Sequence, residues 1–217
     1  MIKICQMADV VFLGLHGADG EGGKVQAAFD LLGIRYTGTD FVSGALAMDK
    51  CLAKELFMQN GIPTPAGFRL KKGQEPGEGQ QPKFPCVVKV SSGGSSIGVS
   101  IVQKEEDYQA ALDDAFLYGD EVVVEEYIKG KRRQLDGKAL PIGNVPKEGF
   151  YDYKNKYHGS TIEICPRRSA KSTRKIQKIQ SVYSMSCACI NMHDDFMMDE
   201  AGLLSGGEYA PGMTSPP

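Results

Sequence analysis

The chain carries almost no excess charge of either sign. Its 25 lysines and arginines nearly balance its 27 aspartates and glutamates, which leaves a formal net charge of −2 on 217 residues. Proteins that bind nucleic acid or membrane surfaces often carry a pronounced basic surplus. We therefore expect a partner that is neither a nucleic acid nor a membrane.

Long apolar runs are also lacking. No segment approaches the roughly 20 apolar residues that a membrane-spanning helix needs. The first residues, "MIKICQMADVVFLGLHG", contain one lysine and an apolar stretch that is interrupted by Gln6 and Asp9. A secretory signal would have a cleaner apolar stretch and a cleavage site of small residues.

The cysteines lack the spacing of a metal site or a redox pair. The six cysteines stand at positions 5, 51, 86, 165, 187 and 189, with no CxxC pair and no zinc-like spacing to the three histidines. Most lie in apolar segments, where a free cysteine behaves as a small hydrophobe. We expect buried thiols in a reducing compartment, and hence a cytoplasmic protein.

Helix and strand patterns alternate in the first part of the chain. The apolar run over 10–15 predicts a buried strand, and the Gly-rich residues 16–23 predict a turn. A short amphipathic helix over 24–33 and a second short strand over 34–40 follow. A longer helix is expected over 43–61, with Ser43 as its N-cap. Its apolar face is predicted to hold Leu46, Leu52, Leu56 and Phe57.

Antiparallel pairing is expected to dominate later. Residues 71–83 are polar and rich in Gly and Pro, which predicts a linker. Residues 84–102 read as strand, glycine loop and strand. A helix over 105–119, a strand over 120–128, a charged helix over about 169–186 and a final hairpin complete the pattern. We expect an α+β architecture with a ligand cleft on a sheet.

The glycine loop offers a candidate anion site. Lys89 precedes "VSSGGSSIG", whose glycines permit close backbone approach and whose serines offer hydroxyl and amide donors to phosphate. The loop is not a Walker A motif, since neither GK[ST] nor a helix follows it. Lys89 alone is equally typical of an outward-facing residue on an edge strand.

Other candidate residues are ambiguous on their own. Lys50 lies on a helix that also carries Lys54, and the acids of "VVVEEYIKG" suit either a nucleotide cleft or a charged strand end. Asp195 and Glu208 fall on the two arms of the expected hairpin. Paired carboxylates bind Mg²⁺ together with phosphate oxygens. A solvated hairpin end explains these two residues equally well.

Taken together, these segments resemble the D-alanine–D-alanine ligase family of the ATP-grasp fold. "LHGADGEGGKVQAAFDLLGIRYTGTD", "SGALAMDKCLAKELFMQNGIPTP", "VVKVSSGGSSIGVS", "VEEYIKG", "FYDYKNKY" and "PGMT" follow in family order from about residue 8 to 214. The set is similar above all to the vancomycin-resistance branch, whose ligases make D-alanyl-D-lactate or D-alanyl-D-serine. The resemblance implies an ATP-dependent ligase of cell-wall precursor synthesis that forms D-alanyl-D-alanine through an acyl phosphate. It also implies a homodimer.

The resemblance assigns roles by motif position. It implies ATP contacts at Lys50, Lys89, Ser96, Glu125, Glu126, Ile128 and Lys156. It implies catalytic roles for Ser95, Tyr157 and His193, substrate contacts for His16 and Glu21, and Mg²⁺ or Mn²⁺ ligands at Asp195 and Glu208. The expected parts are a partial N-terminal α/β domain over 1–42, a helical linker with the small ATP-grasp subdomain over 43–130, and a C-terminal subdomain over 131–217.

The chain departs from the family pattern at functional positions. His193 stands where the family has an arginine that stabilises the tetrahedral intermediate, and an imidazole cannot reproduce a bidentate guanidinium. "EYAPGMT" lacks the asparagine that is the family's second metal ligand. Counting forward along the motif puts Glu208 at the metal glutamate, and counting back puts Gly206 there; we favour Glu208.

Further differences concern length. Most of the family's N-terminal domain precedes "LHG", where this chain has a short segment, and part of a strand is missing after "IKG". We therefore expect ligase activity for the family and little or no turnover by this chain alone. A relative that binds nucleotide without ligation, and another ATP-grasp carboxylate–amine ligase, are the alternatives.

Overall fold

The computed structural model describes residues 1–15, 17–94 and 96–129, and beyond these the backbones of five strands over 131–136, 142–146, 161–164, 193–198 and 204–210. The helices are α1 (Ile2–Cys5), α2 (Ala18–Glu21), α3 (Lys24–Leu31), α4 (Phe41–Met48), α5 (Lys50–Gln59), the 3-10 turn η1 (Glu105–Asp107) and α6 (Tyr108–Ala115). Among these residues no helix is both long and apolar enough to span a membrane.

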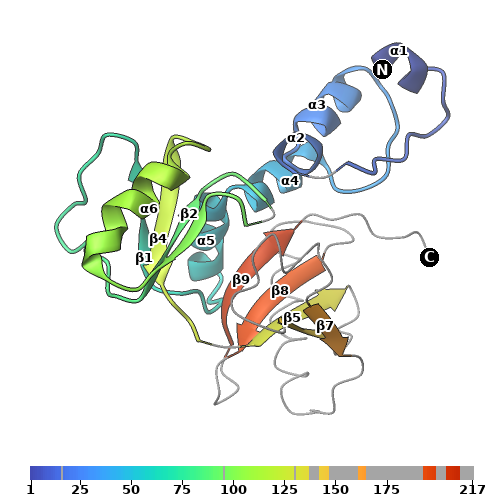
Figure 1. The fold of residues 1–217 in the computed structure, drawn as a ribbon. Helices are drawn as coiled ribbons and strands as arrows, with labels where there is room; N and C mark the ends of the chain where they lie inside the picture. Colours follow the sequence, from blue (N-terminus) through green and yellow to red (C-terminus); the bar gives the residue numbers. More distant parts are fainter. Residues whose placement is uncertain are drawn as a thin grey trace.

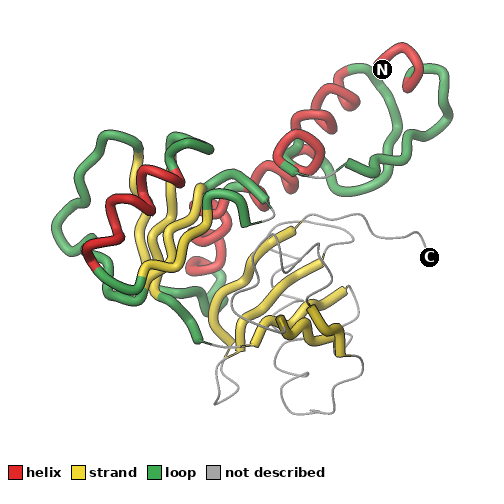
Figure 2. Tube along the Cα trace, viewed as in Figure 1, coloured by secondary structure: helices red, strands yellow, loops and turns green. Residues whose placement is uncertain are grey.

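Two antiparallel sheets carry most of the described structure. The first contains β1 (Gly67–Lys71), β2 (Cys86–Val90), β3 (Val99–Val102) and β4 (Glu121–Glu126) in the order β1-β4-β2-β3. The second contains β5 (Lys131–Asp136), β6 (Ile142–Pro146), β7 (Thr161–Ile164), β8 (His193–Met198) and β9 (Leu204–Ala210) in the order β7-β6-β5-β8-β9. Figure 1 shows both sheets, and Figure 2 shows α6 beside the first sheet while α1, α2 and α3 extend away from it. The expected α+β class is confirmed.

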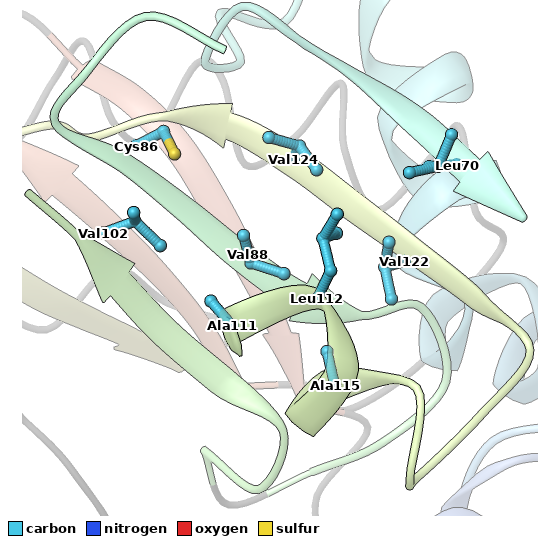
Figure 3. Close-up of a cluster of buried hydrophobic side chains, with 9 residues drawn as sticks. All are labelled: Leu70, Cys86, Val88, Val102, Ala111, Leu112, Ala115, Val122 and Val124. Atoms are coloured by element: carbon cyan, nitrogen blue, oxygen red, sulfur yellow. The ribbon is translucent and has the colours of Figure 1, made fainter. Parts of the chain in front are cut away.

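The main core of the described residues lies between the first sheet and α6. Because strand side chains alternate between faces, every second residue of β2 and β4 points toward α6. Val88 and Val122 are fully buried there, and Ala115 of α6 packs against them. Figure 3 shows this cluster, which consists of Leu70, Cys86, Val88, Val102, Ala111, Leu112, Ala115, Val122 and Val124.

Helix α5 lies on the opposite side of this sheet, in contact with β4. The strand, glycine loop and strand expected over 84–102 are confirmed, since β2 and β3 pair antiparallel. The polar stretch over 71–83 joins β1 to β2. The expected charged helix over about 169–186 lies outside the described residues.

The single helix expected over 43–61 is wrong, because it is two helices that meet at Asp49. This residue is extended (φ −85°, ψ 104°), and its carboxylate accepts hydrogen bonds from the amides of Cys51 and Leu52, which makes it the N-cap of α5. The N-cap of α4 is Asp40, which accepts from the amide of Ser43. Ser43 is therefore the third residue of α4 rather than its cap.

The break at Asp49 also changes which residues are buried. Leu52, expected on the apolar face, is 38% exposed. The buried face of α5 instead holds Cys51, Ala53, Lys54 and Phe57. If the helical pattern is continued across Asp49, it places Leu52 on the buried face, because it treats α4 and α5 as one helix.

The first expected strand is reduced to one bridge. Val11 pairs with Tyr36 in a parallel bridge, while Val10 is 53% and Phe12 60% exposed. The apolar run over 10–15 is therefore not buried as a strand among the described residues. The helix expected over 24–33 is confirmed as α3.

Candidate functional site

The face of the first sheet that is opposite α6 carries a buried ion pair. Lys89 of β2 and Glu125 of β4 lie on this face, in strands that pair Val87 with Glu125 and Lys89 with Val123. The ammonium of Lys89 donates to Oε1 of Glu125. The side chains are 21% and 10% exposed, respectively. Strand β2 lies between β3 and β4, so Lys89 is not an outward residue of an edge strand.

A second lysine reaches the same carboxylate from helix α5. The ammonium of Lys54 lies 3.1 Å from Oε2 of Glu125, and both side chains are 10% exposed. It also donates to Oγ1 of Thr64 at 3.1 Å and to the carbonyl of Pro65. Glu125 is therefore held from two sides, one oxygen by each lysine.

The two lysines keep Glu125 ionised in spite of its burial. Burial by itself raises the pKa of a carboxyl, but the positive charges of Lys89 and Lys54 and the hydrogen bonds from both ammonium groups lower the pKa of Glu125 below its ordinary value of 4.5. The result is a desolvated carboxylate with two cations beside it.

Gly67 lets β1 approach the backbone of β4 closely beside Glu125. Gly67 of β1 pairs with Glu125 of β4. A Cβ atom at position 67 would lie 2.3 Å from the carbonyl oxygen of Val124 and 2.8 Å from the Cβ of Glu125. Only glycine permits β1 to approach β4 this closely at Glu125.

The glycine loop begins directly after β2. The amide of Val90 donates to the carbonyl of Gly98 at 3.0 Å, which closes the loop. Ser96 has φ 62°, a left-handed conformation that non-glycine residues rarely adopt. Such strained positions concentrate at ligand-binding sites.

The N-terminus of α5 is tied to this loop. The hydroxyl of Ser91 donates to Oδ1 of Asp49 at 2.8 Å, and Asp49 forms an antiparallel bridge with Ser92. The amide of Lys50 donates to the carbonyl of Ser91 at 3.0 Å. The Lys50 ammonium donates to the carbonyl of Gly93 at 2.8 Å. The loop and Lys50 therefore form one unit, and Lys89 lies two residues before it.

Two of three other candidates have hydrogen-bond partners. The carboxylate of Glu126 accepts from the amide of Ala66 at 2.9 Å, and the carboxylate of Glu21 accepts from the amide of Gly17 at 2.7 Å. Ile128 follows β4 and is partly buried. These contacts fix the positions of the two carboxylates and leave their roles toward a ligand as predictions.

The hairpin of β8 and β9 brings Asp195 and Glu208 opposite each other. The two residues are partners in the antiparallel ladder, and so are His193 and Ala210. The register shifts between Phe196 and Met197, which leaves Gly206 without a partner in the ladder. This register agrees with Glu208, rather than Gly206, as the residue that accompanies Asp195. The hairpin itself, expected from the sequence, is confirmed.

The remaining candidates, His16, Ser95, Lys156 and Tyr157, lie outside the described residues. Three of the six cysteines are described, and these three are free thiols.

Sequence reasoning missed the roles of Lys54 and Asp49. Lys54 stands in the sequence only as a second lysine on the helix of Lys50, and no pattern marks it as buried. Asp49 stands inside a continuous helical pattern, so its capping role is visible only from its contacts with Ser91 and Ser92.

A metal site at the start of α5 is not supported. Ligand atoms of Asp49, Cys51 and Glu121 lie within 4.8 Å of one another. However, burial raises the pKa of the Cys51 thiol to about 11, which keeps it protonated and a poor metal ligand. The carboxylate of Asp49 is already engaged with two helix amides.

Comparison with known proteins identifies the family. The family model described as the D-ala D-ala ligase C-terminus matches residues 56–216. The chain belongs to the D-alanine–D-alanine ligase family. The D-alanine–D-alanine ligase of Pediococcus pentosaceus is 38% identical, over 99% of this chain and 64% of the relative. The D-alanine–D-alanine ligase of Lacticaseibacillus casei is 34% identical, over 99% of this chain and 62% of the relative. The chain thus spans less than two thirds of the length of these two ligases.

Solved ligase structures share the fold. The D-alanine–D-alanine ligase of Bacillus anthracis matches with a TM-score of 0.84 and 33% identity, over 98% of this chain and 73% of that one. Its structure complexed with ATP matches with a TM-score of 0.82 and 30% identity, over 96% and 69%. The VanG D-Ala:D-Ser ligase of Enterococcus faecalis matches with a TM-score of 0.82 and 29% identity, over 94% and 64%. The ATP-grasp fold expected from the motifs is confirmed.

Proposed function

We propose that this protein joins two D-alanines into D-alanyl-D-alanine at the expense of ATP, for peptidoglycan precursor synthesis. The observation that carries the proposal is the linked arrangement of Lys50, the glycine loop and the Lys89–Glu125 pair. It combines cations and backbone amides, which suit phosphate, with a buried acceptor, which suits a nucleobase. A relative of the same fold has been solved with ATP.

In this proposal the nucleotide lies along the face opposite α6. Glu125 accepts a hydrogen bond from the adenine amino group, with Glu126 and Ile128 around the base and ribose. Lys50, Lys89, Lys156 and the loop at Ser96 neutralise the phosphates. Guanine presents an acceptor oxygen where adenine presents its amino group, so an ionised Glu125 disfavours it.

Asp195 and Glu208 are proposed to hold Mg²⁺ or Mn²⁺. Their opposition across β8 and β9 brings two carboxylate-bearing residues onto neighbouring strands, and oxygen donors of this kind fit a hard divalent cation. When bound, such a cation neutralises charge on the transferred phosphoryl group.

The proposed reaction has two steps. A carboxylate oxygen of the first D-alanine attacks the γ-phosphorus of ATP, so that an acyl phosphate forms and ADP leaves. The amine of the second D-alanine then attacks the acyl carbon and loses a proton, and phosphate leaves from the tetrahedral intermediate. The protein's part is to position these groups and to stabilise developing charge, and it needs no covalent nucleophile.

The substrate side rests on fewer observations. Ser95 and Tyr157 are proposed to bind the first D-alanine and close over it, with His16 and Glu21 on the N-terminal side. The division at residues 42 and 130, a homodimer and a cytoplasmic location remain part of the proposal. D-serine or D-lactate is the alternative second substrate, in line with the likeness to a D-Ala:D-Ser ligase.

A second candidate function is nucleotide binding with little or no ligation. The observation that favours it is His193, which stands where the family has an arginine and is the first residue of β8 in the proposed metal hairpin. A neutral imidazole stabilises an oxyanion less well than a guanidinium.

Phosphate release in the presence of ATP and D-alanine, with chromatographic detection of the dipeptide, tests the proposal. Restoring the arginine with His193→Arg is expected to raise turnover of the chain. Tight ATP binding with no dipeptide from either version would instead establish the second candidate. Replacing D-alanine with D-serine or D-lactate in the same assay identifies the second substrate.

A further inference from the structure

Lys54 is the only buried lysine among the residues whose side chains the structure describes; it is 8% exposed. Removing an ammonium group from water costs several kcal/mol unless the charge is paired and hydrogen-bonded. Lys54 meets this requirement with three acceptors from two parts of the chain. These are Thr64 and Pro65 after α5, and Glu125 on β4.

The contacts of Glu125 are divided between its two oxygens. Lys89 holds Oε1, and Lys54 holds Oε2 at 3.1 Å. One contact alone would leave the carboxylate able to turn about its terminal bonds. Two contacts from opposite elements, β2 and α5, fix both the position and the plane of the group.

We propose that Lys54 is a positioning residue, which fixes the carboxylate of Glu125 and through it sets the preference of the site for adenine over guanine nucleotides. The inference rests on the proposed nucleotide site. Lys54 acts through Glu125 in this arrangement, because its ammonium is engaged by Thr64, Pro65 and Glu125.

This role differs from that of a purely structural clamp. A lysine that only fastens α5 to the sheet would affect folding, and would change the affinity for all nucleotides to the same degree. A lysine that orients Glu125 affects adenine nucleotides selectively, because the Glu125 carboxylate contacts the base. Its effect also disappears when the carboxylate is gone.

The test uses the full chain and the non-hydrolysable analogues of ATP and GTP, with dissociation constants measured by calorimetry. The variants are Lys54→Met, which keeps the length and apolar stem, Lys54→Arg, Glu125→Gln, and the double variant Lys54→Met with Glu125→Gln. Arg69→Met is the matched control, because it removes a more exposed cation from the same face of the sheet. Unfolding midpoints show which variants are folded.

We expect Lys54→Met to weaken binding of the ATP analogue about tenfold, the effect of losing one charge-assisted hydrogen bond. Binding of the GTP analogue should change less, so the selectivity falls. Lys54→Arg should restore much of it. In the Glu125→Gln background, Lys54→Met should have almost no further effect. If Lys54→Met does not fold, Lys54→Gln, which removes the charge but keeps a hydrogen-bond donor, takes its place and should also lower the selectivity.

Three results would overturn the inference. The first is equal loss of affinity for both analogues in Lys54→Met. The second is a full additional loss from Lys54→Met in the Glu125→Gln background, since the lysine would then act independently of Glu125. The third is unchanged selectivity in Lys54→Gln where Lys54→Met does not fold. Failure of the unmodified chain to bind the ATP analogue would be a different result, because it removes the proposed nucleotide site itself and the inference with it.

Discussion

The two faces of the four-stranded sheet use the same strands for different purposes. Toward α6, Val88 and Val122 are completely buried in an apolar cluster. Toward α5, Lys89 is one residue after Val88 and Glu125 is three residues after Val122, and these two side chains form an ion pair. Since the side-chain period of a strand is two residues, a single register decides both faces.

The two faces contribute differently: the apolar face contributes to stability, and the charged face contributes to the proposed ligand binding. The apolar face gains free energy from burial and needs no exact partner for each group. The charged face gains little from burying its ions, because desolvation offsets much of their attraction. A buried charge cluster of this kind is better explained by what it positions than by what it adds to stability.

The largest effect is expected when a charge is moved to the apolar face. Val88→Asp places an unpaired carboxylate at a position that is 0% exposed. We expect it to reduce the free energy of unfolding by at least about 3 kcal/mol, or to prevent folding. Val88→Ala is the control, with a loss of about 2 kcal/mol from the cavity alone. Chemical unfolding measures both. Similar free energies of unfolding for Val88→Asp and Val88→Ala would mean that the face toward α6 tolerates a charge, as the face toward α5 does.

The next effect concerns protonation of Glu125. Its pKa in the folded protein is lowered below 4.5 by Lys89 and Lys54, against the opposing effect of burial. Its contribution to stability is therefore complete above that value, and is lost as the pH falls through the folded pKa. Unfolding free energies measured from about pH 6 down to about pH 3 should fall less steeply for Glu125→Gln than for the unmodified chain.

The exposed Glu78, which lies between β1 and β2, supplies the control. Glu78→Gln should leave the pH profile unchanged. Parallel profiles for the unmodified chain and Glu125→Gln would contradict the assignment of a linked carboxylate to the buried face.

Sequence patterns predicted some of the local elements. Alternation of apolar and polar residues, together with glycine, is sufficient to identify the β2–loop–β3 unit and the β8–β9 hairpin. The hairpin prediction put Asp195 and Glu208 on its two arms, and the structure added the register that pairs them. The family motifs added the ATP-grasp fold and the roles expected of the site residues.

What the sequence did not reveal depends on contacts between distant residues. The break at Asp49 is stabilised by Ser91 and Ser92 of the glycine loop, and the helical pattern continues through it without a signal. Likewise, Lys54 is buried because Glu125 is brought beside it by a strand that follows much later. The role of a polar residue on a helix face can be recognised only when the structure shows which residue it contacts.

A moderate effect is expected from the N-cap of α5, and the chain offers a matched pair. Asp49→Ala and Asp40→Ala each remove a capping carboxylate, so each should cost about 1 kcal/mol of stability. Only Asp49 also holds the hydroxyl of Ser91 in the loop. Asp49→Ala should therefore weaken binding of the ATP analogue about fivefold, which corresponds to about 1 kcal/mol, while Asp40→Ala leaves it unchanged. If the two variants weakened binding of the ATP analogue equally, the contact between Asp49 and Ser91 could not be the cause.

The smallest effect is expected from a charge that lies on the α5 face of the sheet but remains in solvent. Arg69 is 3.7 Å from Glu55 and 4.0 Å from Glu121, and its side chain is 50% exposed. Exposed pairs are screened by water and salt, so Arg69→Met should change the free energy of unfolding by less than about 0.5 kcal/mol. Chemical unfolding at low and high salt measures it. A loss comparable with that of Val88→Ala would mean that burial is not what distinguishes the Lys54–Glu125–Lys89 cluster from other charges on this face.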